Sequence, residues 1–339
     1  MGRCLELARS GAGNTYPNPM VGAVIVHNDK IIGEGWHQRA GEAHAEVVAF
    51  NAVADTSKLQ DSTLYVNLEP CSHHGRTPPC ADLIIRSKIP RVVVGSLDPT
   101  PAVAGNGIAR LRDAGCEVSV GVLEAECDEL NKRFFTYHRK RRPYIILKWA
   151  QSGDGFLAPS ERDGKASVPV TNIFSHQLVH KMRAREMAIM VGARTLQQDD
   201  PMLNVRHWAG NDPVPVVLSA RSELDLKNKL FDQDRRVFIL GNPNIQASGQ
   251  VTTLGQGPLS AREVASILYE QGFQSVLVEG GKEVLELFIE AGLWDEAWIF
   301  KAPYRHFYNG TKSPVFDSRP VKEVGLRGDL LEIHKHIAH

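Results

Sequence analysis

The chain of 339 residues lacks an excess of charge of either sign, because 39 Lys and Arg side chains balance 39 Asp and Glu side chains. This balance disfavours a strongly basic nucleic-acid-binding protein. The sequence also lacks any apolar run near the roughly 18–20 residues that a membrane span requires. We therefore expect neither nucleic acid nor a membrane as a partner. The hydrophobic share of 42% and the charged share of 23% are ordinary for a folded protein, which excludes a disordered or collagen-like chain.

Cysteine is scarce and odd in number. The five cysteines are Cys4, Cys71, Cys80, Cys116 and Cys127. A disulfide framework is not expected in a chain of this length without a secretory signal, and residues 1–8 lack the long apolar core of such a signal. We therefore expect a reducing, cytoplasmic location, where cysteines serve as buried side chains, metal ligands or nucleophiles.

The length predicts two domains, at roughly 100–200 residues per domain. A basic stretch at 138–143 lies between the two halves of the pattern. A localisation or nucleic-acid signal is one interpretation of it, but a solvated connector between domains is the interpretation we favour. The expected domains are therefore residues 1–140 and 143–339.

Alternating apolar segments predict an α/β layer with a mostly parallel sheet in the first half, and a second α/β layer after it. Helices are predicted at 3–10, 44–54, 81–87, 107–114, 125–137, 174–186, 261–271 and 281–291. Strands are predicted at 21–26, 31–32, 63–68, 91–95, 117–122, 144–147, 187–191, 214–218, 236–240, 275–278 and 298–300. His27-Asn28-Asp29 is predicted to be a turn between the first two strands.

One set of residues in the first half predicts a metal site. His44 begins a predicted helix, Cys71 follows a predicted strand, and Cys80 precedes another helix. One imidazole and two thiolates make a three-ligand zinc set whose fourth position is free for water. Zinc lowers the pKa of that water toward neutrality, so hydroxide is available at pH 7. Glu46 is not needed as a ligand and can shuttle protons to a ring nitrogen and a departing amine.

His-x-Glu followed by Pro-Cys is typical of zinc-dependent nucleobase deaminases, although the two cysteines there are separated by two residues. Here eight residues separate them. With this spacing, residues 69–80 resemble the zinc segment of the bifunctional riboflavin-biosynthesis deaminase–reductase family. Three further segments resemble the same family: Pro17-Asn18-Pro19-x-Val21-Gly22, Gly33-Glu34-Gly35-Trp36-His37 and the run from Asp98 to Gly105.

The resemblance implies a cytidine-deaminase-like three-layer α/β domain in the first half. It implies zinc ligands His44, Cys71 and Cys80, with Glu46 as the catalytic proton shuttle. The substrate contacts that it implies are Asn18 and His37 near the pyrimidine, His73 and Arg76 near the ribose phosphate, and Asp98 near the sugar. A loop that carries His73 and Arg76 suits a phosphate.

The second half contains no Gly-x-Gly-x-x-Gly segment after a strand, so the usual dinucleotide fingerprint is absent. Gly280-Gly281 and Gly192 follow predicted buried strands instead, where backbone N–H groups at a helix start suit a phosphate. Segments beginning at Lys148, Val191, Asp199 and Val278 resemble the reductase domain of the same family, which is similar in fold to dihydrofolate reductase.

For this second domain the resemblance implies reduction of a ribosyl group to a ribityl group by NADPH. The implied substrate contacts are Lys148, Thr171, Asp199, Arg206 and Glu279, with Arg206 as the partner of the phosphate. The implied cofactor contacts are Ser152, Gly192, Thr195, Ser219, Gly280 and Gly281. The resemblance also implies a homo-oligomer, a dimer formed through the reductase domain.

The implied reaction sequence begins with hydrolytic removal of an amine from 2,5-diamino-6-ribosylamino-4(3H)-pyrimidinone 5′-phosphate, and reduction of the product follows. Three alternatives remain open. One is a nucleoside or tRNA-base deaminase with a C-terminal binding module, and another is a non-catalytic zinc protein. The third is a deaminase with a decayed reductase domain, because Pro169, Ser219 and the segment after Pro303 depart from the family pattern.

Overall fold

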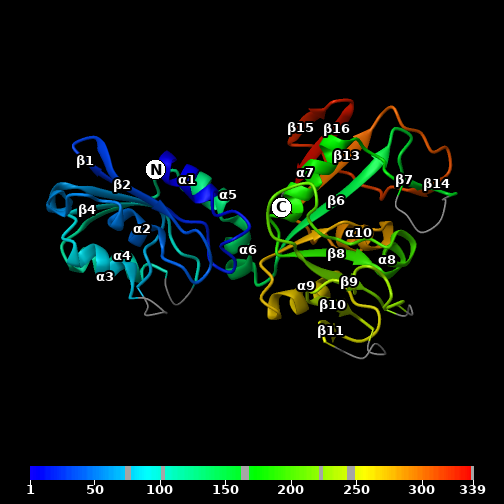
Figure 1. Ribbon diagram of the computed structural model, residues 1–339, viewed down its shortest axis with the longest axis horizontal. Coiled ribbons are helices and arrows are strands. Elements are labelled where there is room, and N and C mark those ends of the chain that lie inside the picture. The colour runs from blue at the N-terminus through cyan, green and yellow to red at the C-terminus, as the bar shows by residue number, and fades with distance from the viewer. Residues whose placement is uncertain (73–77, 101–103, 162–167, 221–223, 243–248, 337–339) are drawn as a thin grey trace. The chain divides into compact units, whose positions relative to one another are not determined.

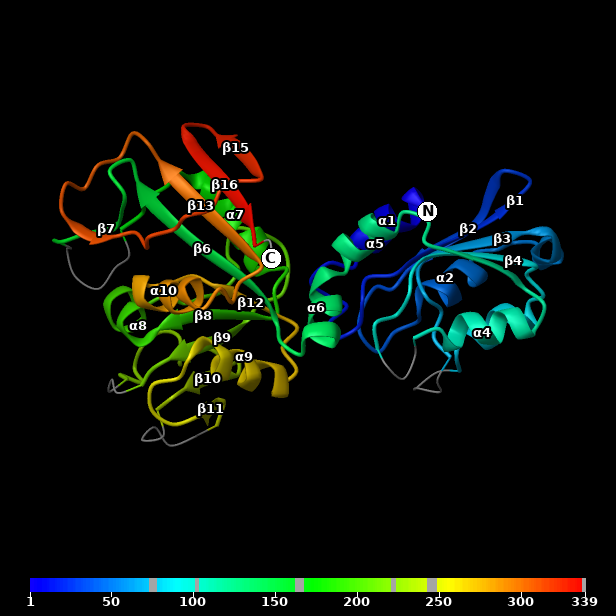
Figure 2. The same cartoon turned by 180° about the vertical axis from the view of Figure 1, so that it is seen from behind.

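The computed structural model describes residues 1–72, 78–100, 104–161, 168–220, 224–242 and 249–336. The chain divides into two units, Met1–Arg141 and Arg142–His339, which run from blue to blue-green and from green to red in Figure 1. Each unit is built on its own sheet (Figures 1 and 2). In the described segments, no helix combines the length and the apolar character that a membrane crossing needs.

The sheet of the first unit has the strand order β2-β1-β3-β4-β5. Its strands are β1 (Gly22–His27), β2 (Lys30–Trp36), β3 (Thr63–Leu68), β4 (Arg91–Ser96) and β5 (Glu117–Val120). The prediction of a mostly parallel sheet is wrong for this unit, because β1 pairs antiparallel with both β2 and β3. Asn28 and Asp29 cause the first reversal, since both adopt positive φ and thereby form the tight two-residue turn of a hairpin.

Helices cover both faces of this sheet, so the unit has three layers. They are α1 (Gly2–Arg9), α2 (Ala45–Asn51), α3 (Cys80–Arg86), α4 (Asn106–Asp113), α5 (Glu124–Leu130) and α6 (Lys132–Lys140), with a 3₁₀ turn η1 (Thr56–Asp61). Ala23 and Ile25 of β1 pack with α2, α3 and α4, whereas the intervening Val24 packs with α1 on the opposite face. This alternation is the period-2 pattern of a strand buried on both sides.

The single helix predicted at 125–137 is wrong, because two helices, α5 and α6, meet at Asn131. The Asn131 side chain forms two hydrogen bonds with the backbone of Met20. Its Oδ1 accepts from the backbone N–H of Met20 at 2.8 Å, and its Nδ2 donates to the carbonyl of Met20 at 2.9 Å. Asn131 therefore anchors the loop that carries Asn18.

The second unit contains a nine-stranded sheet with the order β11-β10-β9-β8-β12-β6-β13-β16-β15. These strands are β6 (Tyr144–Ser152), β8 (Ala188–Gly192), β9 (Val214–Leu218), β10 (Val237–Leu240), β11 (Val251–Leu254), β12 (Ser275–Val278), β13 (Glu296–Ala302), β15 (Lys322–Leu326) and β16 (Asp329–Lys335). Pairing is parallel from β11 to β13 and antiparallel for β16 and β15. A separate ribbon joins β7 (Phe156–Pro159) to β14 (Gly310–Lys312).

Helices also cover both faces of this second sheet. They are α7 (Ile173–Arg183), α8 (Ala193–Asp199), α9 (Ala261–Glu270) and α10 (Lys282–Glu290). Helices α9 and α10 pack on the face that carries Ile145 and Leu147, whereas α7 packs on the face that carries Tyr144 and Ile146. Because the central strands are parallel, their carboxyl ends share one sheet edge, which is where such folds place ligands.

The basic stretch at 138–143 ends α6 and enters β6. The expectation of a fully solvated connector is wrong at Arg142, whose guanidinium forms a two-point ion pair with Asp295 at 2.5 and 2.7 Å. The Asp295 carboxylate also accepts from the backbone N–H of Ile145 at 2.9 Å. Arg142 thus fixes the start of β6 within the second unit.

Candidate active sites

The three predicted metal ligands come together in the first unit. His44 is the N-cap residue of α2, Cys71 follows β3, and Cys80 is the first residue of α3. His44 Nδ1 lies 3.3 Å from Cys80 Sγ and 3.6 Å from Cys71 Sγ, and all three ligand atoms lie within 4.8 Å of one another. Tetrahedral zinc with ordinary bond lengths separates such nitrogen and sulfur atoms by about 3.5 Å. The donor set and its spacing therefore fit zinc.

The contact between the two thiols favours the thiolate form of Cys71. The hydrogen bond from the Cys80 thiol, more than any other contact, lowers the pKa of Cys71 to about 4. The pKa of Cys80 is raised, because its proton is the one shared with Cys71. The backbone N–H of Cys80 also donates to Cys71 Sγ at 3.3 Å. A zinc ion held by these residues would take the place of that shared proton, since thiolate is the form that binds zinc.

Glu46 lies two residues after the metal ligand His44, in the first turn of α2, and is only 3% exposed. Burial raises the pKa of its carboxyl group, and the nearby Cys71 thiolate raises it further. A carboxyl group with a raised pKa takes up a proton more readily than an ordinary one, which suits general acid–base catalysis.

Asn18 and His37 form a hydrogen-bonded pair beside the ligand set. His37 Nδ1 lies 3.0 Å from the carbonyl of Ala43, which can only accept, so this nitrogen carries the proton. His37 Nε2 then accepts from Asn18 Nδ2 at 3.0 Å. Burial lowers the pKa of His37, in keeping with a neutral ring. The His37 ring meets His44 edge-on, with centroids 5.6 Å apart.

Sequence reasoning missed Glu69, which organises the loop that carries Asp98. Its buried carboxylate accepts from the backbone N–H groups of Asp98, Gly105 and Gly107 at 3.2, 3.0 and 2.9 Å. A Cβ atom at Gly107 would lie 2.1 Å from the carbonyl oxygen of Pro70, so only glycine fits there. The available signal was a charged residue directly after a buried strand. The predicted phosphate contacts His73 and Arg76 lie outside the described residues.

The second unit brings Lys148 and Glu279 together at the carboxyl end of its sheet. Lys148 Nζ lies 3.7 Å from Glu279 Oε2. Sequence reasoning missed Arg183, the last residue of α7, which donates to both carboxylate oxygens of Glu279 at 2.7 and 2.8 Å. Burial alone would raise the pKa of Glu279, but Arg183 and Lys148 together lower it to about 2. Burial lowers the pKa of Lys148.

The other three predicted substrate contacts, Arg206, Asp199 and Thr171, lie in different segments of the second unit. Arg206 is exposed, but its backbone N–H donates to His180 Nδ1 at 3.0 Å, and its guanidinium binds the side chain of Asn204. Asp199 ends α8. Thr171 precedes α7, so the length of that helix, roughly 15 Å, separates it from Arg183 at the other end.

Four predicted cofactor contacts meet where β8 and β12 end. The backbone N–H of Gly192 donates to the carbonyl of Gly280 at 2.9 Å. A Cβ atom at Gly281 would lie 2.9 Å from Thr195 Oγ1, and Gly280 has a φ of +111°, which requires glycine. Gly281 is also the N-cap residue of α10, where backbone N–H groups face outward.

Ser152 is the last residue of β6, and Ser219 directly follows β9. Both side chains are buried. The Ser152 hydroxyl binds Asp154 at 2.5 Å, and the Ser219 hydroxyl accepts from Asn242 at 3.3 Å. The Asp154 carboxylate also accepts from the backbone N–H groups of Phe307 and Tyr308 at 3.2 and 2.7 Å. The segment after Pro303, which departs from the family pattern, is thus tied to the turn after β6.

Comparisons with known proteins agree with this geometry. A family model described as the cytidine and deoxycytidylate deaminase zinc-binding region matches residues 1–96. A second, described as the RibD C-terminal domain, matches residues 143–332. The riboflavin biosynthesis protein RibD of Aquifex aeolicus is 41% identical over 307 residues, which cover 88% of this chain and 85% of that protein. The RibD of Escherichia coli is 36% identical over 323 residues, covering 89% and 86%.

Solved structures give the same result over both units. The Thermotoga maritima diaminohydroxyphosphoribosylaminopyrimidine deaminase/5-amino-6-(5-phosphoribosylamino)uracil reductase has a TM-score of 0.90 and 36% identity, covering 99% of this chain and 97% of that one. RibD of Acinetobacter baumannii has a TM-score of 0.88 and 33% identity, covering 99% and 98%.

Proposed function

Since the chain belongs to the RibD family and is a bifunctional deaminase and reductase of riboflavin biosynthesis, we propose that residues 1–140 carry the deaminase and residues 143–339 the reductase. The deaminase acts on 2,5-diamino-6-ribosylamino-4(3H)-pyrimidinone 5′-phosphate, and the reductase acts on the deaminated product. The observation that carries this proposal is the cluster of His44, Cys71 and Cys80 beside the buried Glu46. Family membership removes the alternatives of a nucleoside or tRNA-base deaminase and of a non-catalytic zinc protein.

In the deaminase, His44, Cys71 and Cys80 hold zinc, which when bound lowers the pKa of water toward neutrality. Glu46 takes one proton from the attacking water and delivers it to the ring nitrogen beside the amine-bearing carbon. It then takes the second proton from the hydroxyl group now bonded to that carbon and gives it to the departing amine, so that water and an amine become a carbonyl and ammonia. The raised pKa of Glu46 supports both transfers.

The hydrogen bonds around the ligand set support the substrate contacts that we propose for the deaminase. Asn18 and the neutral His37 hold the pyrimidine, and Asp98 holds the sugar on the loop that Glu69 orders. His73 and Arg76 bind the phosphate. Because the His37 ring is neutral, we propose that it positions the substrate through hydrogen bonds and does not act as a charged group.

In the reductase, Gly192, Thr195, Gly280 and Gly281 hold NADPH, with Ser152 and Ser219 along the same sheet edge, and NADPH supplies a hydride when bound. Reduction of the ribosyl carbon would break its bond to the ring oxygen, and that oxygen would take a proton as the ring opens. Lys148 is suited to donate that proton, because burial lowers its pKa. Arg206 binds the phosphate, while Thr171, Asp199 and Glu279 contact the rest of the substrate.

The working form that we propose is a homodimer through the reductase unit in a reducing, cytoplasmic setting. A reducing setting keeps Cys71 and Cys80 available as thiolate ligands. The partner that we propose is a small phosphorylated pyrimidine, with neither nucleic acid nor a membrane, and the zero net charge disfavours nucleic acid.

The test is NADPH oxidation by the zinc-loaded full chain, followed by absorbance after freshly generated diaminopyrimidine phosphate is added. We expect oxidation, accompanied by ammonia release. The Glu46→Gln variant should lose both, and addition of the deaminated product should restore NADPH oxidation alone. Ammonia release without NADPH oxidation would leave a deaminase with a decayed reductase. Oxidation by Glu46→Gln from the diaminopyrimidine would overturn the proposed order of steps.

A further inference from the structure

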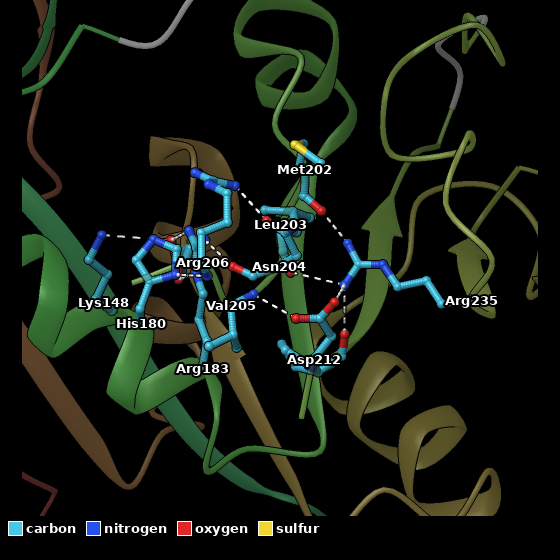
Figure 3. Close-up of polar contacts among 12 residues, drawn as sticks. Lys148, His180, Arg183, Met202, Leu203, Asn204, Val205, Arg206, Asp212 and Arg235 are labelled. Atoms are coloured by element: carbon cyan, nitrogen blue, oxygen red, sulfur yellow. Dashed lines mark hydrogen bonds and ion pairs between the residues drawn. The ribbon is translucent and has the colours of Figure 1, made fainter. Parts of the chain in front are cut away.

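The segment at 202–206, which ends in Arg206, is held by side chains from outside it. Each of its five residues has one backbone polar group bound by such a side chain (Figure 3). Arg235 donates to the carbonyls of Met202 and Leu203, the latter at 3.1 Å. Arg183 donates to the carbonyl of Asn204 at 3.0 Å, while the N–H groups of Val205 and Arg206 donate to Asp212 Oδ1 at 2.6 Å and His180 Nδ1 at 3.0 Å.

This segment needs outside partners because it belongs to neither a helix nor a strand. Its backbone groups therefore have no regular ladder to join. Leu203 has a φ of +50°, a left-handed conformation that is disfavoured for a residue with a Cβ atom. The same Leu203 is buried at 2% exposure in the apolar cluster beneath β8 and β9. Such a conformation persists where its surroundings determine it from several directions.

Arg235 and Asp212 hold the segment from the side away from Lys148, with the segment between them and Lys148 in Figure 3. Arg235 precedes β10 and Asp212 precedes β9, and their charged groups lie 3.9 Å apart. Arg235 also donates to the carbonyl of Pro213 at 3.2 Å. One guanidinium can serve several carbonyls at once because its donors form a planar fork, which a lysine ammonium does not provide.

We propose that Arg235 and Asp212 are positioning residues of the reductase. They fix segment 202–206 so that Arg206 stands ready for the substrate phosphate, and they touch neither substrate nor cofactor themselves. This inference rests on the proposed function of Arg206. It predicts that the two residues affect phosphate binding and leave the hydride-transfer step unchanged, since an error in placing one binding group raises KM without changing kcat.

The experiment measures reductase kinetics of the full chain with the deaminated phosphorylated pyrimidine and NADPH. Arg235→Ala should raise KM for this substrate about tenfold, as loss of one positioned contact does, while kcat stays within about twofold. For the same compound without its phosphate, KM should be the same in Arg235→Ala and in the wild type, because that compound offers Arg206 no phosphate to bind. Arg236→Ala is the matched control, since Arg236 is the neighbouring arginine, is exposed, and lies over the Phe238 ring at 4.7 Å.

Denaturant unfolding of the second unit reports whether a variant is folded, because the deaminase lies in the other unit and does not report on the fold of this one. If Arg235→Ala does not fold, a second pair carries the test: Asp212→Asn keeps an acceptor for the N–H of Val205, and Asp212→Ala removes it. We expect KM near the wild-type value for Asp212→Asn and a raised KM for Asp212→Ala. An equal effect on the phosphorylated and dephosphorylated substrates would overturn the inference.

A double variant separates this inference from the function on which it rests. Arg206→Ala should raise KM for the phosphorylated substrate, and adding Arg235→Ala should raise it no further, because both changes remove the same contact. Unchanged KM in Arg206→Ala would overturn the proposed role of Arg206. A raised KM in Arg206→Ala with an unchanged KM in Arg235→Ala would overturn the positioning role alone.

Discussion

The guanidinium of Arg183 binds both carboxylate oxygens of Glu279, at 2.7 and 2.8 Å, inside the second unit. Both side chains are buried, with 12% and 8% exposed. Glu279 is therefore held in one orientation by a partner from α7 while Lys148 approaches it from β6. Such a pair is costly to break, because the remaining charge is left buried without a partner.

Replacing Arg183 by methionine should lower the free energy of unfolding of the second unit by about 3–5 kcal/mol, the usual effect of removing one member of a buried ion pair. Denaturant unfolding followed by fluorescence measures it. The control is Arg194→Ala, because Arg194 and its partner Glu283 are about 70% exposed. That change should cost less than about 1 kcal/mol. Equal effects of the two variants would contradict a buried, structurally important pair.

His180 should make the second unit less stable in acid. Burial and the nearby Arg183 and Arg206 lower the pKa of His180 to about 4, whereas its ordinary value is 6.5. Between these pH values His180 is protonated in the unfolded chain but not in the folded chain. The free energy of unfolding therefore falls as pH drops from about 6.5 to about 4. The full difference is about 3 kcal/mol.

The measurement for His180 is unfolding free energy against pH, compared between the wild type and His180→Gln. The variant should lose the part of the slope between pH 6.5 and 4 that His180 contributes. The acid response of Glu279 lies lower, since its folded pKa of about 2 keeps its contribution intact above pH 4.5. An unchanged slope in the variant would assign the acid sensitivity to other groups.

Apolar patterning was enough to predict the buried core of both units. The predicted strands 63–68, 214–218 and 275–278 match β3, β9 and β12 at both ends. Each is a short apolar or alternating run inside a sheet, where burial decides the structure. The predictions did not include α8, β7, β11, β14, β15 and β16, which are short, polar or half-exposed and depend on tertiary pairing.

Two of the missed strands, β15 and β16, did carry a signal. Arg327 and Gly328 both adopt positive φ between them, and a glycine between two strand-forming runs is typical of a hairpin.

The two sites differ in how far the sequence could predict them. The zinc ligands stand in segments whose residue types and family resemblance indicate the chemistry, and the structure brings all three together. Arg183 and Arg235 stand in no such motif. Arg183 lies at the end of a helix and Arg235 in a loop, and their roles arise from contacts with Glu279 and with segment 202–206, which are distant in sequence. Only the folded arrangement shows these contacts.

Glu69 should control the deaminase pocket without binding zinc. In Glu69→Gln the neutral amide accepts the N–H groups of Asp98, Gly105 and Gly107 less well, since charged acceptors form hydrogen bonds about twice as strong. We expect kcat/KM of the deaminase to fall about tenfold, equivalent to about 1.4 kcal/mol. Zinc content and reductase activity should stay unchanged. Loss of zinc in the variant would instead give Glu69 a role in placing Cys71.

Removing one zinc ligand should abolish the deaminase activity of the first unit and leave the reductase activity of the second unit unchanged. Cys80→Ala takes away one thiolate and the donor to Cys71, so the site keeps only two of its three ligands. We expect bound zinc and ammonia release to be lost, while NADPH oxidation with the deaminated product continues. Metal analysis by mass spectrometry and the two activity assays measure these outcomes.

Cys127→Ala is the matched control, because Cys127 is also a buried free thiol of the same unit but lies against Gly95 on the α5 side of the sheet. It should keep its zinc and its deaminase activity. Zinc retained at the wild-type level in Cys80→Ala would show that Cys80 is not a ligand. Loss of NADPH oxidation in Cys80→Ala, with the second unit still folded, would show that the reductase depends on the metal site and contradict two separate active sites.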